Sequence, residues 1–245
     1  MQRLQLGLFF ALLGCAFAVH AGWVETDKDG GTTLVADGRM KTIDQDGNYF
    51  VADSQRGTIM FVDVKGKTYA VSTADELCAA TVASMRELLQ NAPPEQREGM
   101  EQMLKRDKSN APQAKVSIVK VGPGGRVAGY DTTIYKVMLN GELYERVWIA
   151  SAAVFKRELE KMNIGAMNHI FRCMSPFEED AGVENTEEYR GLLKTGWPLK
   201  SESVQEGSIY IHEASQLVEK NIPEVEFAPP ANFRKIPIRD FIKAQ

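Results

Sequence analysis

The chain has 245 residues, of which 44% are hydrophobic, and its 29 basic and 33 acidic residues give a formal net charge of −4 at pH 7. This length and apolar content are sufficient for one substantial hydrophobic core. The mild acidity and the lack of a basic stripe argue against a nucleic-acid partner.

The first 21 residues have the layout of a secretory signal peptide. Arg3 supplies a short positive start, an apolar run extends over residues 4–19, and Val19-His20-Ala21 gives a small-x-small ending. The run is too short for a comfortable membrane span, and no second apolar run follows. We therefore expect export to the periplasm or the exterior, with residues 1–21 removed as a leader and residues 22–245 forming one domain.

A second processing route competes within the same leader. Leu12-Leu13-Gly14-Cys15 resembles a bacterial lipobox, in which the cysteine becomes lipidated and N-terminal. Leu13 stands where a lipobox usually has a small residue, so cleavage after Ala21 is favoured and lipidation of Cys15 is the alternative. Lipidation would make the chain an outer-membrane lipoprotein. Simple cleavage would leave it free, with Cys15 only a small apolar residue of the leader.

Residues 32–73 predict an antiparallel meander. Runs of β-branched and aromatic residues alternate there with short turns such as Asp37-Gly38 and Asp44-Gln45-Asp46-Gly47. The expected strands are Thr32–Ala36, Arg39–Ile43, Asn48–Ala52, Thr58–Val64 and Thr68–Thr73.

Two helices should follow the meander. Ala74–Gln90 repeats its apolar residues at helical spacing, and Asn91-Ala92-Pro93-Pro94 ends it. Glu95–Lys108 has acidic residues early and basic residues late, as the helix dipole favours.

The sheet is expected to resume after the second helix. A strand over Lys115–Val121 would end at the turn-like Gly122-Pro123-Gly124-Gly125, and Val127–Leu139 would return. Asn140-Gly141 is a strong two-residue hairpin signal and leads to Leu143–Ala150.

The last hundred residues mix both element types. Ser151 can cap a helix that runs to Phe171, and Glu187–Leu193 reads as a short helix. More sheet is expected from Gly196-Trp197 onward and over residues 208–220.

Several strands depart from the alternation typical of a sheet with one wet face. Tyr49–Ala52 and Ile59–Val62 are apolar on both faces. In the strand over 143–149, Leu143, Val147 and Ile149 should face one way and Tyr144 and Trp148 the other. Helices can cover one face. The other face would then need a second sheet, a lipid or a second protein.

Two cysteines, Cys78 and Cys173, lie beyond the leader, both in segments that read as helical. In an oxidising compartment they can form a disulfide, and two separate buried thiols are an equally good interpretation.

The sequence nominates no metal site. Asp27-Lys28-Asp29-Gly30 and Asp44-Gln45-Asp46-Gly47 look like fragments of calcium loops, but each lacks the following Glu that such a loop needs. Ordinary β-turns explain both. His169 and Cys173 are four apart on a helix, yet two ligands do not make a closed zinc site.

No catalytic constellation is evident either. His212 has no Ser or Cys partner that the sequence can nominate. Nucleophile-elbow, Walker and dinucleotide motifs are missing. We therefore expect no catalytic residue, no metal and no cofactor.

Some motifs carry a resemblance to a known family. They are Gly38-Arg39-Met40, Asp46-Gly47, Asp53-Ser54, the strand Thr58–Val64, the paired Val127–Val137 and Glu145–Ala150, and Phe227–Phe233. Together they resemble an uncharacterised family of secreted bacterial proteins related to the periplasmic lipoprotein carriers, over most of residues 32–240. The resemblance implies an α+β fold, an open, curved antiparallel sheet (a half-barrel) covered by a few helices, which holds acyl chains in its apolar hollow.

Export, doubly apolar strands and this resemblance together favour a non-enzymatic binding module. Its partner would be a lipid or lipoprotein, near a membrane but without a mature transmembrane segment. The side chains expected to line the hollow are Phe50, Met60, Val62, Tyr135, Trp148 and Met167. The alternative is a structural or interaction protein of the cell envelope, with its apolar sheet face docked on another envelope protein. A third hypothesis is an enzyme whose site is assembled from scattered residues.

Overall fold

The computed structural model of this protein describes residues 19–105, 115–174, 183–205 and 208–244. Its strands are β1 (Val19–Asp27), β2 (Thr32–Ala36), β3 (Arg39–Ile43), β4 (Tyr49–Asp53), β5 (Thr58–Asp63), β6 (Thr68–Thr73), β7 (Val116–Val127), β8 (Tyr130–Leu139), β9 (Glu142–Ala150), β10 (Trp197–Gln205), β11 (Ser208–Pro223) and β12 (Arg234–Lys235). Its helices are α1 (Ala74–Asn91), α2 (Pro94–Lys105), α3 (Ala153–Lys161), α4 (Ile164–Met174), α5 (Glu187–Leu193) and α6 (Ile238–Lys243), with 3-10 turns η1 (Val183–Asn185) and η2 (Glu224–Phe227).

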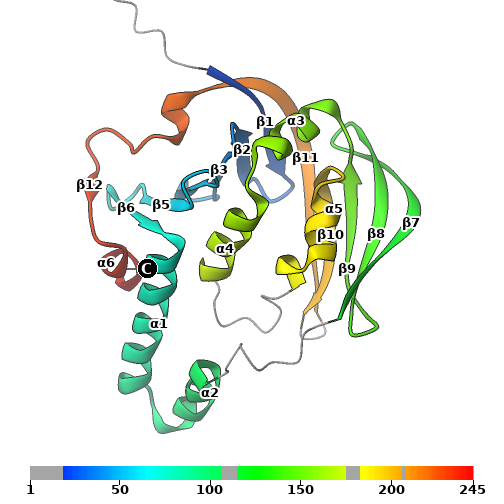
Figure 1. Cartoon of the computed structure of the whole chain (residues 1–245). Coiled ribbons are helices and arrows are strands. Elements are labelled where there is room, and N and C mark those ends of the chain that lie inside the picture. The colour runs from blue at the N-terminus through cyan, green and yellow to red at the C-terminus, as the bar shows by residue number, and fades with distance from the viewer. Residues whose placement is uncertain (1–18, 106–114, 175–182, 206–207, 245) are drawn as a thin grey trace, which may run out of the picture.

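In the described part of the chain, twelve strands form one sheet in the order β12-β6-β5-β4-β3-β2-β1-β11-β10-β9-β8-β7. Neighbouring strands are antiparallel except for the parallel pair of β12 and β6. The sheet is open and curved, and the helices lie on its inner side (Figure 1). The predicted α+β class with a curved, open, mainly antiparallel sheet is confirmed.

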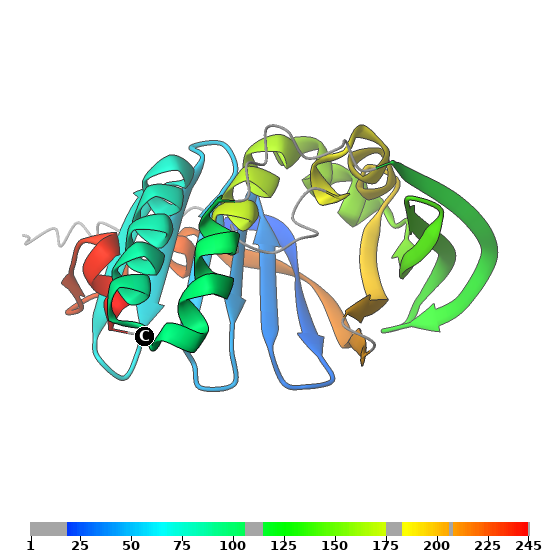
Figure 2. The same ribbon diagram turned by 90° about the horizontal axis from the view of Figure 1, so that it is seen from below.

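One long strand, β11, joins two half-sheets. Its first part, Ser208–Glu213, pairs with β10, and from Ala214 onward it pairs with β1. The first half-sheet therefore runs from β12 to β1 and the second from β10 to β7. Figure 2 shows α1 and α2 over the first half and the second half curling around α5.

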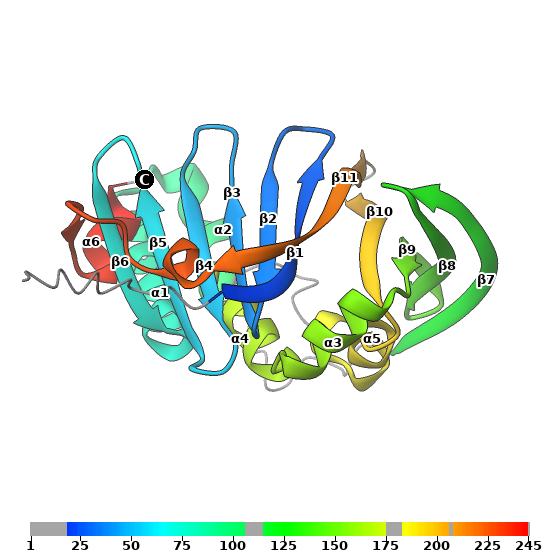
Figure 3. The ribbon, with the colours of Figure 1, turned by 90° about the horizontal axis from the view of Figure 1, so that it is seen from above.

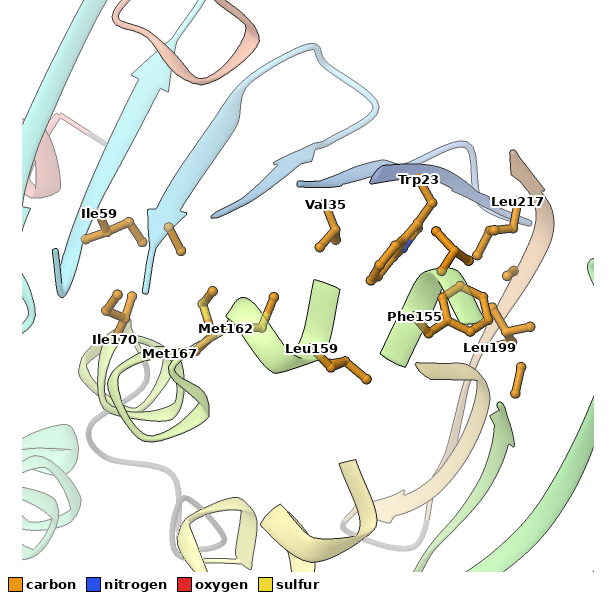
Figure 4. Close-up of a cluster of buried hydrophobic side chains, with 14 of the residues drawn as sticks. Trp23, Val35, Ile59, Phe155, Leu159, Met162, Met167, Ile170, Leu199 and Leu217 are labelled. Atoms are coloured by element: carbon orange, nitrogen blue, oxygen red, sulfur yellow. The ribbon is translucent and has the colours of Figure 1, made fainter. Parts of the chain in front are cut away.

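The inner face of the sheet carries the main core. Trp23 of β1 is fully buried and makes edge-to-face contacts with Phe155 of α3 and Trp197 of β10, at centroid distances of 5.1 and 4.9 Å. Ile59 of β5 and Ile170 of α4 lie further along the same core (Figure 4). Rings packed edge to face contribute beyond the area that they bury.

The outer face of the first half-sheet is also buried, by the chain's own C-terminal segment. Leu34, Val51 and Met60 cluster there with Ile222 and with Phe227 of η2. Figure 3 shows this segment crossing the face from β11 toward β12. The doubly apolar strands are thus explained within the chain, and the expected second sheet, lipid or second protein is not needed over this face.

Charged contacts hold this C-terminal segment in place. Arg39 donates two hydrogen bonds to Glu224, of 2.6 and 2.8 Å, and its guanidinium lies 4.6 Å from the centre of the Phe227 ring. The Arg39 hydrogen bonds lower the pKa of Glu224 to about 2. Lys41 forms a second ion pair with Glu226, at 3.0 Å. The segment is therefore attached by both apolar and ionic contacts.

The second half-sheet encloses a smaller core around α5. Val137, Val147, Ile149 and Leu192 are buried together, with Tyr144 packed against them. Tyr144 was expected on the opposite face from Val147. That prediction is wrong because the pairing register of β8 and β9 shifts between Val137 and Met138, which breaks the simple alternation.

The glycine-rich stretch Gly122–Gly125 is not the predicted turn. It lies inside β7, where the register shifts twice, and the chain reverses at Ala128-Gly129 instead, both with positive φ. Glycine and proline in an edge strand support bulges as readily as turns, and β7 is an edge strand. Such bulges also make the exposed edge a poor template for pairing with another chain.

Strands β1 and β12 and helix α6 were not predicted, whereas most of the remaining elements lie close to their predicted positions. The long helix expected from Ser151 is divided into α3 and α4 around Met162-Asn163, and its N-cap is Ala152 without a side-chain hydrogen bond. The end of the predicted helix 95–108 lies outside the described residues.

A buried carboxylate ties the helices to the first half-sheet. Glu158 of α3 is fully buried and accepts a 2.8 Å hydrogen bond from the backbone N–H of Asp37, in the β2–β3 turn. Arg157 and Lys161 donate to the same carboxylate at 3.2 and 3.1 Å. Ser54 donates to the carbonyl of Gly38 in the same turn, at 2.6 Å. The Glu158 carboxylate thus fixes α3 against the β2–β3 turn, and Ser54 ties that turn to the one that follows β4.

We expect Glu158→Gln to destabilise the fold by about 1–3 kcal/mol, because a buried acceptor for a backbone N–H and two cations loses its charge. Urea unfolding followed by circular dichroism measures this change. Glu160→Gln, an exposed position on the same helix, is the matched control and should leave stability nearly unchanged. Equal effects of the two substitutions would contradict a structural role for the Glu158 carboxylate.

Candidate functional site: an apolar cavity under α1 and α6

A cavity of about 480 Å³ lies between the inner face of β3–β5 and the helices α1, α4 and α6. Its volume is in the range of small-molecule sites. The apolar side chains that line it are Phe50, Phe61, Leu77, Met174, Phe241 and Ile242. They come from both the sheet and the helices, so the cavity exists only once α1 and α6 have packed on the strands.

Three phenylalanines of the lining, Phe50, Phe61 and Phe241, belong to a longer row of aromatic rings. Phe50 lies 6.1 Å from Phe171 of α4 and 6.4 Å from Phe61, and Phe61 lies 5.8 Å from Phe241 of α6, measured between ring centres. Ring pairs at these distances stabilise one another, so the three lining rings are held in place by their neighbours.

The polar lining carries only negative formal charge. Asp44, Asn48 and Asp63 contribute to it, and no Lys, Arg or His is among the residues that border the cavity in the described part of the chain. Asn48 accepts a hydrogen bond from the Val64 N–H, and Asp63 accepts one from the Gly66 N–H. Asp63 therefore both orders a turn beside the cavity and contributes to its negative charge, and the neutral Asn48 side chain orders the same turn.

Helix α6 closes one side of the cavity and is held by ion pairs at its outer surface. Glu87 of α1 accepts hydrogen bonds from Lys243 at 2.8 Å and from Arg239 at 3.3 Å. These two cations lower the pKa of the Glu87 carboxyl. On the inner side of the same helix, Phe241 is buried.

A disulfide joins the two helices that meet at the cavity. Cys78 of α1 and Cys173 of α4 are bonded, with their Cα atoms 4.5 Å apart and a sequence separation of 95. The bond fixes α1 beside α4 and so keeps Leu77 and Met174 next to the cavity. Crosslinks across so long a loop mainly restrict the unfolded chain.

The histidines do not form a metal site in the described residues, where no group of three candidate ligands is found. The Cys173 sulfur is engaged in the disulfide, and His169 bonds to Asp75 at 2.8 Å and to Arg172 at 2.8 Å. The interpretation of His169 and Cys173 as structural residues fits these contacts.

Of the six residues expected to line a hollow, Phe50 and Val62 border this cavity. Met60 and Val62 both pack in the cluster on the outer face. They point to that face because residues adjacent in a strand alternate between faces, and Phe61 occupies the inner one.

The other three expected residues lie elsewhere. Met167 is buried in the main core, and Tyr135 packs in the cluster around α5. The Lys200 ammonium lies over the Trp148 ring, 4.7 Å from the centre of that ring. The sequence reasoning missed Phe61, Phe241 and Ile242. The spacing of Ile238, Phe241 and Ile242 is that of one helical face and could have revealed α6.

A second hollow, of about 650 Å³, lies between α3, α4 and α5. It is larger, but its border carries both signs of charge, from Lys156, Arg190 and Lys194 and from Glu160 and Glu187. Lys156, Lys194 and both glutamates are exposed. Mixed, solvated charges do not select a ligand class, so the smaller and more apolar cavity is the better candidate site.

His212 has a partner that the sequence could not nominate. Its Nε2 lies 3.2 Å from the buried carboxylate of Glu25 on the neighbouring strand, and Trp197 donates to the other oxygen at 2.5 Å. The hydrogen bond to Glu25 raises the pKa of His212 above its ordinary value. The pair lies outside the cavity lining.

Comparisons with known proteins add little to this geometry. No protein-family model and no curated protein matches the sequence. Among the solved structures, "Crystal structure of MucB" matches at 14% sequence identity with a TM-score of 0.28, over 89% of this chain and 59% of that one. This chain therefore spans less than two thirds of the length of that structure. A TM-score of this size establishes no shared function.

No described helix is both long enough and apolar enough to span a membrane.

We expect Glu87→Gln to speed amide hydrogen exchange in α6 by about threefold or more, because the helix loses both of its ion pairs to α1. Exchange followed by mass spectrometry measures this on peptides covering residues 238–243. Arg86→Gln, at an exposed neighbouring position, is the control and should leave α6 exchange unchanged. Identical α6 exchange in the two variants would show that the ion pairs do not hold the helix.

The His212–Glu25 pair should make stability depend on pH in one direction. Because the folded-state pKa of His212 is raised, its contribution is full below the ordinary histidine pKa of about 6.5 and is lost as pH rises through the folded-state value.

The difference in unfolding free energy between wild type and His212→Asn should therefore shrink from mildly acidic to alkaline pH. Chemical denaturation at a series of pH values measures it. Ile211→Asn, next to it on the same strand, introduces no change in titration and should give a constant difference. A constant difference for His212→Asn as well would refute the coupling.

Proposed function

We propose that this chain is an exported, non-enzymatic binding module for an apolar ligand in the bacterial envelope. The single observation that carries the proposal is the apolar cavity between β3–β5 and α1 and α6. A site bordered by three phenylalanines, two of them on the sheet and one on a terminal helix, suits a flexible hydrocarbon chain better than a polar metabolite.

The charge of the cavity lining narrows the ligand class. A free fatty acid would bring its carboxylate toward Asp44 and Asp63, with no cation of the lining to neutralise it. An acyl chain held in an ester or amide linkage has no such charge. We therefore propose an esterified or amidated acyl chain, as lipids and lipoproteins carry, as the ligand.

Filling the cavity tests this proposal. Thr81→Leu on α1 should weaken binding of N-phenyl-1-naphthylamine, a fluorescent apolar probe, by about tenfold, because the larger side chain occupies ligand space. Ala79→Leu makes a similar change at an exposed position of the same helix and should bind as the wild type does.

Displacement of the same probe then separates the ligand classes. Methyl dodecanoate should displace it at lower concentration than dodecanoate at neutral pH. Equal probe affinity in Thr81→Leu and wild type would contradict the cavity as the site, whereas stronger displacement by the free acid would contradict the proposed ligand class.

A second candidate function is an interaction protein of the envelope. The observation that favours it is an exposed apolar stretch at the start of β11, where Ile209, Tyr210 and Ile211 are 68%, 56% and 55% exposed. A photo-crosslinking amino acid at position 210 should trap a specific protein adduct in cells if this stretch docks on a partner. The same label at exposed Leu88 of α1 is the control.

A further inference from the structure

The first three residues of β1 are built into the sheet, although one small-x-small pattern assigns them to the leader. Val19, His20 and Ala21 pair with Pro223, Ile222 and Asn221 of β11. They therefore extend the strand pairing at the point where the chain leaves β11 for the C-terminal segment.

His20 also has side-chain partners. Its Nε2 lies 2.8 Å from Glu224, and its Nδ1 lies 3.5 Å from Asp37. Glu224 is the same carboxylate that Arg39 holds with two hydrogen bonds. His20 thus belongs to the group of charges that anchors the C-terminal segment over the outer face.

The next residue, Gly22, is a poor position for a new chain end. It is buried between β2 and β11, where it pairs with Ala36 and Lys220. A Cβ at this position would lie 2.1 Å from the carbonyl oxygen of Val35. Cleavage after Ala21 would remove the three β1 residues that pair with β11 and would place a charged α-ammonium group inside the sheet, between β2 and β11. It would also remove His20 from Glu224.

Cleavage three residues earlier avoids both costs. Ala16-Phe17-Ala18 is also a small-x-small sequence at the end of the apolar run, as a leader peptidase requires. The new ammonium group would then lie on Val19, which is 57% exposed at the free end of the strand. All nine residues of β1 and the His20 contacts would remain.

We propose that the leader is removed by hydrolysis of the Ala18–Val19 peptide bond, so that the mature chain begins Val-His-Ala-Gly-Trp. Water adds across this bond, which leaves the carboxylate on Ala18 and the ammonium group on Val19. The inference rests on the export that the proposed function includes.

The test uses the full chain with its own leader, produced in a Gram-negative bacterium. Intact mass and N-terminal sequencing of the periplasmic protein should find the Val19 terminus in at least tenfold excess over Gly22. Ala18→Leu should abolish the Val19 terminus, because a leader peptidase needs a small residue before the cut. Ala21→Leu, the matched substitution at the competing site, should leave the Val19 terminus intact.

Each contrary result has a distinct meaning. A mature chain that begins at Gly22, or at a lipidated Cys15, would overturn the inference and leave export supported. A full-length chain that stays in the cytoplasm would overturn export, and with it both the processing site and the envelope location. Binding of the naphthylamine probe to the purified chain is measured separately, so the cavity proposal does not depend on this outcome.

Discussion

The arrangement of this protein follows from strands that are apolar on both faces. Each Å² of apolar surface left in water costs roughly 25 cal/mol, so a sheet of this kind is stable only when both sides are covered. Helices α1, α3 and α4 cover the inner side, and the segment after β11 covers the outer side with Phe227. Strand β11 makes this arrangement feasible, because it joins the two half-sheets and ends where the covering segment must begin.

The cavity is the place where coverage of the inner side is incomplete. Close packing is the norm in protein interiors, so a space of this size needs walls that cannot relax into it. Here three phenylalanine rings from β4, β5 and α6 line the space, and the surrounding helices are held by a disulfide between α1 and α4 and by ion pairs between α1 and α6. The site would therefore be largely formed before a ligand binds. The exception is α6, because the ion pairs that join it to Glu87 are exposed to solvent.

Local signals in the sequence predicted most of the secondary structure, because turns such as Asn140-Gly141 and Asp37-Gly38 depend on a few adjacent residues. Placement of side chains was predicted less well. A single register shift moved Tyr144 to the other face, and glycines in β7 formed bulges where a turn was expected. The cavity could not be located from sequence, since Phe61 and Phe241 are far apart in the chain and meet only in the folded protein, where β12 pairs with β6 and α6 packs against α1 and β6.

The C-terminal segment has a mechanical consequence. It is attached at β1, where Pro223 pairs with Val19, and again at β6, where Arg234 pairs with Thr68. Five inter-strand steps separate these strands, a path of about 24 Å at the usual spacing, and eleven residues can reach at most about 40 Å. The segment follows the outer face, whose path lengthens as the sheet curls, and its η2 turn shortens its reach. The segment therefore spans the first half-sheet from β1 to β6 without being fully extended, so it ties the two ends of this half-sheet together and still leaves room for its curvature to change.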